Sequence, residues 1–177
     1  MSALIIATNY GVEQDEIVKP LDALKNAGVA VTVAAPKLDP IETLVGDKDP
    51  GTTIEPNATL GDVDASEYDL LVIPGGTINA DTLRTEEAAV DLVKAFSESG
   101  KTIAAICHAP WVLAEAGILN GKSLTSYPSL ATDLRNAGAT WEDVELQECV
   151  AEGWTLLTSR SPKDLDAFSN AVVEAAN

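Results

Sequence analysis

A cysteine and a histidine stand side by side, Cys107 and His108, where an apolar run meets a helix-like segment. Residues 102–106 are apolar or β-branched and are typical of a buried strand, and Pro110 suits the first turn of a helix. A side chain at such a sharp corner points toward solvent. A thiol at a helix N-terminus is favoured as thiolate by unpaired N–H groups and by the helix dipole. The pattern therefore predicts that Cys107 is a nucleophile.

Each of the two residues has a simpler interpretation when taken alone. A free cysteine is most often a small buried apolar side chain, and a single histidine is most often a surface or core residue. His108 is the only histidine among 177 residues. The corner also has small residues, Ala105 and Ala109, two places to either side of Cys107, as a tight strand-to-helix turn requires. The combination favours nucleophilic chemistry, although adjacency alone does not ensure that thiol and imidazole meet.

Two other segments follow apolar runs in the same way, residues 9–16 after the first run and Gly75-Gly76 after Ile73. In sheets of parallel strands, ligands bind outside the carboxyl ends of the strands, so we expect these segments to converge with Cys107 on one site. The N–H groups of a Gly-Gly pair could bind a developing oxyanion there. The segment has neither the spacing of a dinucleotide loop nor the Lys-Ser/Thr of a P-loop, and no cofactor is expected.

Glu16 is a candidate for the acidic residue that acts on the thiol. At the start of a helix its carboxylate would complement the helix dipole, which needs no chemistry. Its functional role would be to reach Cys107, either protonated and donating to the thiolate or ionised and acting as a base. Glu13 and Asp15 are competitors for that role, and spacing alone does not choose among them.

Strand-like and helix-like segments alternate along the chain. This pattern predicts one domain over residues 1–177, a three-layer α/β/α sandwich around a mostly parallel sheet. A loop is expected at 37–51, and a short hairpin on the edge of the sheet at 52–60. The strands are expected at 3–7, 29–35, 68–73, 102–106, 124–126, 144–149 and 154–159, and the helices at 17–27, 86–99, 111–116, 129–136 and from Pro162.

Charge and composition exclude several classes of partner. Asp and Glu number 28 against 11 Lys and Arg, which gives a formal charge of −17 spread over the whole chain. Nucleic acids and anionic membrane surfaces are therefore poor partners. Because salt screens such self-repulsion, the acidic balance favours a halophilic, salt-rich cytoplasm over an ordinary acidic cytosol. No segment could span a bilayer, no export signal is recognised, and Cys107 and Cys149 are expected to be reduced cytoplasmic thiols.

Several stretches together resemble the PfpI-like intracellular cysteine protease family. They are Leu71-Val72-Ile73-Pro74-Gly75-Gly76, Ala105-Ile106-Cys107-His108-Ala109-Pro110, Leu124-Thr125-Ser126-Tyr127-Pro128, residues 136–139 and residues 158–165. The likeness covers essentially the whole chain, in order. It implies a flavodoxin-like, class I glutamine amidotransferase-like fold, shared with the superfamily of the Parkinson-disease-associated deglycase.

The resemblance also implies roles for individual residues. Cys107 matches the family nucleophile and His108 its neighbouring histidine, and Glu16 matches the glutamate that hydrogen-bonds the nucleophile. Asp81 matches an acidic residue that a neighbouring subunit offers to orient the histidine, which implies a homo-oligomer, a dimer or hexamer, with shared active sites. The N–H groups of Gly76 and His108 would form the oxyanion hole, and Tyr127 would lie near the nucleophile.

Three positions depart from the family pattern. Ala109 replaces a glycine, Trp111 stands where a polar residue is common, and the loop at 77–80 is one residue longer. These departures bear on substrate size and on the reach of Asp81 more than on the nucleophile. We expect Trp111 to belong to the core.

The resemblance implies a cofactor-independent cysteine hydrolase. Its substrate would be a peptide or a small carbonyl compound such as methylglyoxal or its adducts, as for a glyoxalase or deglycase. The alternative is a stress-responsive redox sensor or protective protein in which Cys107 is oxidised and no dedicated substrate exists. An amidotransferase subunit is disfavoured because no synthetase domain is present and because His108 directly follows the nucleophile.

Overall fold

The main sheet of the computed structural model, which describes residues 1–176, has seven strands. All neighbouring strands are parallel except the edge pair β11 and β12. Their order across the sheet is β11 (Gln147–Cys149), β12 (Thr155–Ser159), β8 (Thr102–Ile106), β7 (Leu70–Ile73), β1 (Ser2–Ile6), β3 (Ala30–Ala35) and β6 (Ala58–Thr59). The chain reverses its direction of travel across the sheet at β1, so the carboxyl ends of β1, β7 and β8 lie beside a topological switch point.

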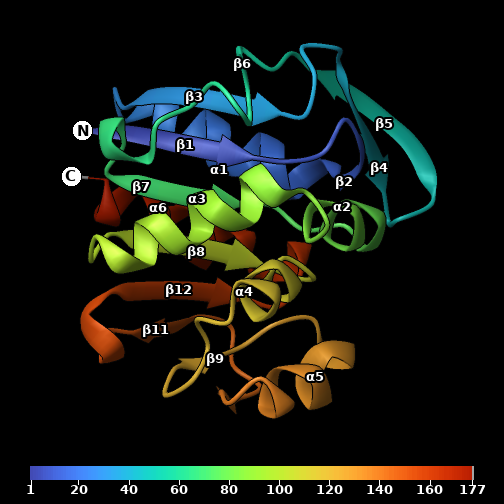
Figure 1. Cartoon of the computed structure of the whole chain (residues 1–177). Coiled ribbons are helices and arrows are strands. Elements are labelled where there is room, and N and C mark those ends of the chain that lie inside the picture. The colour runs from blue at the N-terminus through green and yellow to red at the C-terminus, as the bar shows by residue number, and fades with distance from the viewer. Residues whose placement is uncertain (177) are drawn as a thin grey trace.

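Helices cover both faces of this sheet, as Figure 1 shows. The pair α1 and α6 covers one face, while α3 and α4 cover the other. The helices are α1 (Gln14–Asn26), α2 (Thr77–Leu83), α3 (Glu87–Glu98), α4 (Pro110–Ala116), α5 (Ala131–Asn136) and α6 (Leu165–Ala175). Single 3-10 turns lie at Ala65–Glu67, Pro128–Leu130, Ala151–Gly153 and Pro162–Asp164. The predicted three-layer sandwich is confirmed.

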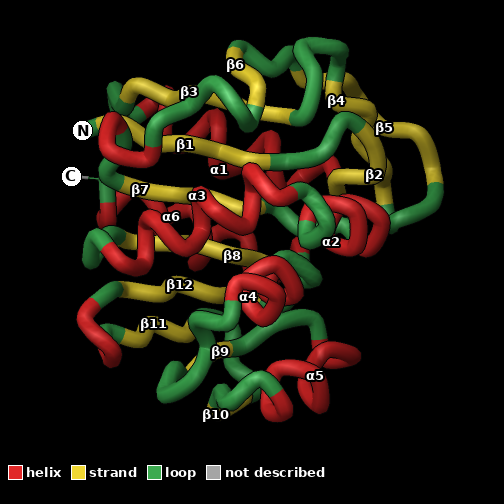
Figure 2. Tube along the Cα trace, in the orientation of Figure 1, coloured by secondary structure: helices red, strands yellow, loops and turns green. Residues whose placement is uncertain are grey.

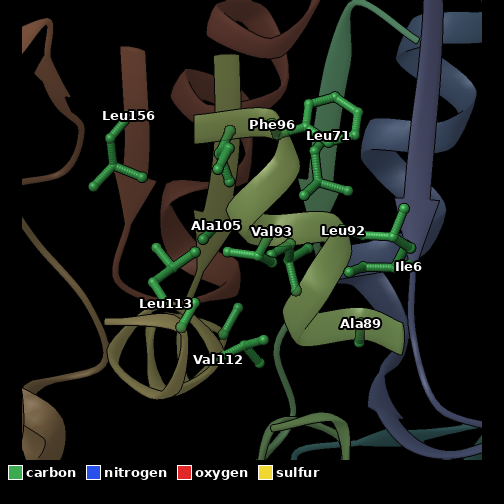
Figure 3. Packing of buried hydrophobic residues seen from close by; sticks show 14 of the residues in the cluster. Ile6, Leu71, Ala89, Leu92, Val93, Phe96, Ala105, Val112, Leu113 and Leu156 are labelled. Atoms are coloured by element: carbon green, nitrogen blue, oxygen red, sulfur yellow. The ribbon is translucent and has the colours of Figure 1, made fainter. Parts of the chain in front are cut away.

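The core is divided into two layers because side chains alternate across each strand. In β1, Ile5 packs toward α1 and α6, whereas Leu4 and Ile6 pack toward α3 and α4. Figure 3 shows the second layer, in which Phe96 and Val93 of α3 lie against the strands. Since both faces are buried, the strands read as nearly continuous apolar runs, which is why they are recognisable in the sequence.

Predictions about two parts of the chain path are wrong. Residues 77–80, described as a loop in the sequence, begin helix α2. Residues 37–51 are not only loop, and the hairpin is not at 52–60: it is formed by β4 (Ile41–Val45) and β5 (Asp49–Ile54). With β2 (Tyr10–Glu13) this hairpin makes a separate three-stranded sheet beside α2 (Figure 2). Pro40 precedes β4, Pro50 lies within β5, and both strands have mixed polarity, so the apolar pattern that identifies the main strands is absent there.

The remaining strands are short, and β9 (Ser123–Leu124) pairs with β10 (Thr140–Trp141) in parallel. No helix in the part of the chain that the structure describes is long and apolar enough to cross a membrane.

Candidate active site

Cys107 forms the corner between β8 and α4. It is one of three residues other than glycine among 1–176 with a positive φ, at 63°. A left-handed conformation costs a residue with a Cβ about 1 kcal/mol, so the corner must be held by its surroundings. The Cys107 N–H donates to the Ser159 carbonyl at 3.0 Å, and its carbonyl accepts from the Tyr127 N–H at 2.8 Å. The strand-to-helix elbow predicted from the sequence is therefore present.

The elbow thiol does not point to solvent. Cys107 is only 4% exposed and His108 5%. Burial, followed by the negative charge of Glu16 when that carboxyl is ionised, raises the pKa of the Cys107 thiol, whereas a hydrogen bond from the Gly76 N–H lowers it. The prediction that this side chain is exposed is wrong for the single chain, and burial of the sulfur opposes the thiolate that the helix N-terminus was expected to favour.

Glu16 lies in the first turn of α1 and is fully buried. Its Oε2 accepts from the Gly75 N–H at 2.9 Å, its carboxyl shares a hydrogen bond with Cys107, and Oε1 has no nitrogen or oxygen partner within residues 1–176. Burial is the main reason that the pKa of Glu16 rises to about 8, with smaller contributions from the charges of Glu13 and Asp47. Of the two roles left open by the sequence, the protonated donor is the one that neutral pH favours.

The Gly75-Gly76 loop fills the space beside the thiol. A Cβ at Gly75 would collide with Glu16 Oε2 and with the Cβ of Cys107, and Gly76 has a φ of 93° with the Gly11 carbonyl against it. Both positions therefore require glycine. The Gly76 N–H is directed at the sulfur, and the His108 N–H has no acceptor within the described chain. These are the two donors that the sequence analysis assigned to an oxyanion.

Asn79, which the sequence analysis missed, holds this loop in place. Its buried Nδ2 donates to the carbonyls of Pro74 and Gly75, each at 3.0 Å. Its Oδ1 accepts from the backbone N–H and the hydroxyl of Thr8 at 2.8 and 2.9 Å. Every hydrogen-bonding group of the side chain thus ties the end of β7 to the end of β1. A lone asparagine has no sequence signal that would distinguish this role from an exposed loop residue.

The imidazole of His108 is clamped between aromatic rings and touches the thiol. Nδ1 lies 3.1 Å from Cys107 Sγ. The ring of Tyr127 stacks on the imidazole with centroids 4.6 Å apart, and Trp111 meets it edge-on at 5.3 Å. Trp111 also packs against the core, so the expectation that it is a core residue holds only in part. Burial lowers the pKa of His108, and the charge of Asp47 partly opposes this effect.

A carboxylate not singled out in the sequence reaches the imidazole through one hydroxyl. Thr77 Oγ1 lies 3.3 Å from His108 Nε2 and donates to Asp47 Oδ2 at 2.9 Å. The competitor Glu13 does not act on the thiol: its two oxygens accept from the N–H groups of Gly46 and Asp47, each at 2.9 Å. Asp47 was missed because it lies in the hairpin interpreted as loop.

Asp81 is exposed on α2, and no hydrogen bond or ion pair joins its carboxylate to another residue of the described chain. The single chain thus brings together Cys107, His108, Glu16 and Gly76, with Tyr127 stacked alongside, and leaves Asp81 outside. Its expected contact with a neighbouring subunit stays a prediction.

A groove of about 750 Å³ is lined by Tyr127, whose ring stacks on His108, and by residues 128, 143 and 160–164, whereas Cys107 and His108 do not line it. Arg160 lies in its wall and forms ion pairs with Asp164 and Asp143, each at 2.9 Å.

Cys107 and Cys149 are both free thiols. Within residues 1–176 no group of three or more His, Cys, Asp and Glu side chains is arranged to hold a metal ion.

Several known proteins are similar to this chain over most of its length. YraA of Bacillus subtilis, provisionally named a cysteine protease, is 38% identical over 157 residues, which cover 89% of this chain and 88% of YraA. A deglycase of Thermococcus kodakarensis is 36% identical over 175 residues, which cover 98% of each protein. The crystal structure of Drosophila melanogaster DJ-1beta superposes with a TM-score of 0.85 at 35% identity, covering 99% of this chain and 91% of that one.

The family description that matches the sequence is "DJ-1/PfpI family", and the match extends over residues 1–175, which include the elbow, the Gly-Gly loop and the glutamate at the start of α1. The chain therefore belongs to the DJ-1/PfpI family.

Proposed function

We propose that this protein is a cofactor-independent cysteine hydrolase that adds the Cys107 thiol to a carbonyl group of a small aldehyde, a glycated adduct or a peptide. The observation that carries the proposal is the 3.1 Å approach of His108 Nδ1 to Cys107 Sγ at a left-handed elbow, with the buried Glu16 carboxyl on the same sulfur. A nucleophile within hydrogen-bond reach of a base is the arrangement that covalent catalysis requires.

The first step starts from a thiol rather than a thiolate. Because burial raises the pKa of Cys107, its proton must move to His108 Nδ1 as the sulfur attacks the carbonyl carbon. The carbonyl oxygen becomes an oxyanion beside two N–H donors: that of His108, which has no acceptor within the described chain, and that of Gly76, which hydrogen-bonds the sulfur before the attack. Removing one such donor from an oxyanion hole typically costs about 100-fold in rate or more.

The second step depends on the substrate. With an aldehyde such as methylglyoxal, the addition gives a hemithioacetal, which rearranges to a thioester that water hydrolyses, so that no group has to leave in the first step. With a peptide, the adduct must expel an amine, and His108 would return the proton to it. The buried Glu16 favours the aldehyde, since a protonated carboxyl and its conjugate base can shuttle one proton between neighbouring carbons without solvent.

The proposal has two further parts, a place for substrate and a contact between subunits. Tyr127 stacks on His108 and also lines the groove, and this link supports the groove as the place where substrate binds next to the site. Asp81 would act on the histidine of a neighbouring subunit in a homo-oligomer, a dimer or hexamer, as the resemblance to the family implies. A cytoplasmic setting rich in salt is part of the same prediction.

The test is turnover of methylglyoxal and of a peptide panel at molar potassium chloride. Cys107→Ala should abolish turnover of every substrate that the wild type accepts. Cys149→Ala is the matched control because it removes another buried thiol, at 9% exposure, from the far edge of the sheet, and it should retain activity. If the wild type turns over no substrate, yet low doses of peroxide convert Cys107 alone to sulfinic acid, the redox sensor is the correct function.

A further inference from the structure

The two ring nitrogens of His108 face different partners. Nδ1 lies 3.1 Å from Cys107 Sγ, and Nε2 lies 3.3 Å from Thr77 Oγ1. A neutral imidazole carries its proton on only one nitrogen, and the partner of the other nitrogen decides which tautomer is present. Whether the Thr77 hydroxyl donates to Nε2 or accepts from it therefore determines whether Nδ1 can accept the thiol proton.

The hydroxyl of Thr77 is already committed as a donor. Its Oγ1–H donates to Asp47 Oδ2 at 2.9 Å, and its backbone N–H donates to Oδ1 of the same carboxylate, also at 2.9 Å. An ionised carboxylate can only accept, so the hydroxyl proton must point toward Asp47. Oγ1 then presents lone pairs to His108, and Nε2 must carry the imidazole proton. Nδ1 is left with its lone pair facing the sulfur.

Asp47 is held for this contact by a second carboxylate. Asp47 has a φ of 57° and follows Gly46 with a φ of 65°, which turns two successive N–H groups the same way. Both N–H groups donate to the buried carboxylate of Glu13, each at 2.9 Å. Consecutive backbone N–H groups of this kind form an anion-binding nest. The nest stabilises a left-handed conformation that would otherwise cost about 1 kcal/mol at a residue with a Cβ.

We propose that Asp47, acting through Thr77, is a positioning residue that holds His108 in the Nε2–H tautomer, so that Nδ1 can take the proton of Cys107. In that transfer the S–H bond breaks and an Nδ1–H bond forms, and the imidazolium keeps its Nε2–H bond to Thr77. The positive charge then faces Asp47 through the hydroxyl. This assignment rests on the proposed nucleophilic function and gives each subunit its own orienting carboxylate, separate from Asp81.

The single histidine makes the tautomer directly measurable. Nitrogen-15 NMR of the imidazole in the folded protein gives one spin system, because His108 is the only histidine. The expected result for the neutral ring is a protonated Nε2 and an unprotonated Nδ1. A protonated Nδ1 in the wild type would overturn the assignment.

Three variants test the chain of donors. Thr77→Ser keeps the hydroxyl and should keep the wild-type tautomer, whereas Thr77→Val keeps the shape without the hydroxyl and should release the ring to a mixture. Asp47→Asn should invert the tautomer: its amide would donate to Thr77 Oγ1, whose own proton would turn toward Nε2. Asparagine tolerates the left-handed conformation as well as aspartate does. The exposed Asp49→Asn, on the same hairpin, is the charge-matched control and should change nothing.

A second measurement uses no substrate of the proposed reaction. Alkylation of Cys107 by iodoacetamide should slow about tenfold or more in Thr77→Val and Asp47→Asn, and Thr77→Ser should restore the rate. Unchanged tautomers and rates in both slow variants would refute the positioning role, even if the enzyme turns over methylglyoxal. Conversely, absent turnover with the expected tautomer shifts would refute the proposed function alone. If one variant fails to fold, the other decides.

Discussion

Replacing Glu16 by Gln should make the protein more stable at alkaline pH while it lowers turnover. Folding raises the pKa of Glu16 from its usual 4.5 to about 8, mainly through burial. The folded state therefore binds this proton more tightly than the unfolded state does. The stabilisation is fully present below pH 4.5 and is lost as the pH rises through about 8.

The size of the change in stability follows from the difference between the pKa values of Glu16 in the unfolded and folded states. Each pKa unit corresponds to about 1.4 kcal/mol, so the free energy of unfolding loses about 5 kcal/mol at most between the two pKa values through Glu16 alone. Glutamine keeps an acceptor for the Gly75 N–H and has no charge to bury. The variant should thus match the wild type within about 1 kcal/mol near pH 5 and exceed its stability by several kcal/mol near pH 9.

Urea unfolding at pH 5 to 9, in constant molar salt, measures the difference. Salt screens the surface acids, and subtraction of the variant from the wild type isolates Glu16. Asp15→Asn is the matched control: it removes one carboxylate from the same helix turn at a partly exposed position and leaves Glu16 intact, so it should keep the wild-type pH dependence. Parallel stability curves for wild type and Glu16→Gln would refute the claim that Glu16 is buried as a neutral acid.

Three other outcomes are expected. Iodoacetamide should label Cys107 faster than Cys149, since only Cys107 has an imidazole nitrogen 3.1 Å from its sulfur, and peptide mass mapping reads the ratio; preferential labelling of Cys149 would contradict the site. The melting temperature should rise by several degrees or more from dilute buffer to molar potassium chloride, because a net charge of −17 repels itself, and a flat response would count against a halophilic protein. Asp81→Ala should lower turnover of the assembled protein without changing the melting temperature; unchanged kinetics across dilution into monomers would rule out a shared site.

The main sheet could be predicted because its strands are buried on both faces. Such strands appear as short apolar runs, and the turns between them are marked by glycine and proline, as at Pro74-Gly75-Gly76. The elbow could be predicted for the same reason, since Cys107 interrupts an apolar run directly before a helix. Those features depend on local sequence alone.

The small sheet and the burial of the site could not be predicted in this way. Strand β5 has no buried residue, although three of the five residues of β4 are buried. The turn that holds Asp47 is bound by Glu13, over thirty residues away in sequence. The pKa of Cys107 depends on how closely Glu16 and Gly75 approach it, and a helix-dipole argument contains no term for that desolvation. Local patterns place Cys107 at the elbow but do not predict how deeply the thiol is buried.

The two carboxylates at the start of α1 divide the work of the site because of their different surroundings. Burial raises the pKa of Glu16, which favours the protonated carboxyl next to the Cys107 sulfur. Glu13, three residues earlier, accepts two N–H groups of the β4–β5 turn and so acts on the far side of the imidazole through Asp47 and Thr77. One helix end thereby sets the geometry on both sides of the Cys107–His108 pair. A shift of α1 relative to β8 would therefore disturb both the contact of Glu16 with the sulfur and the hydrogen bonds of Glu13 that hold Asp47.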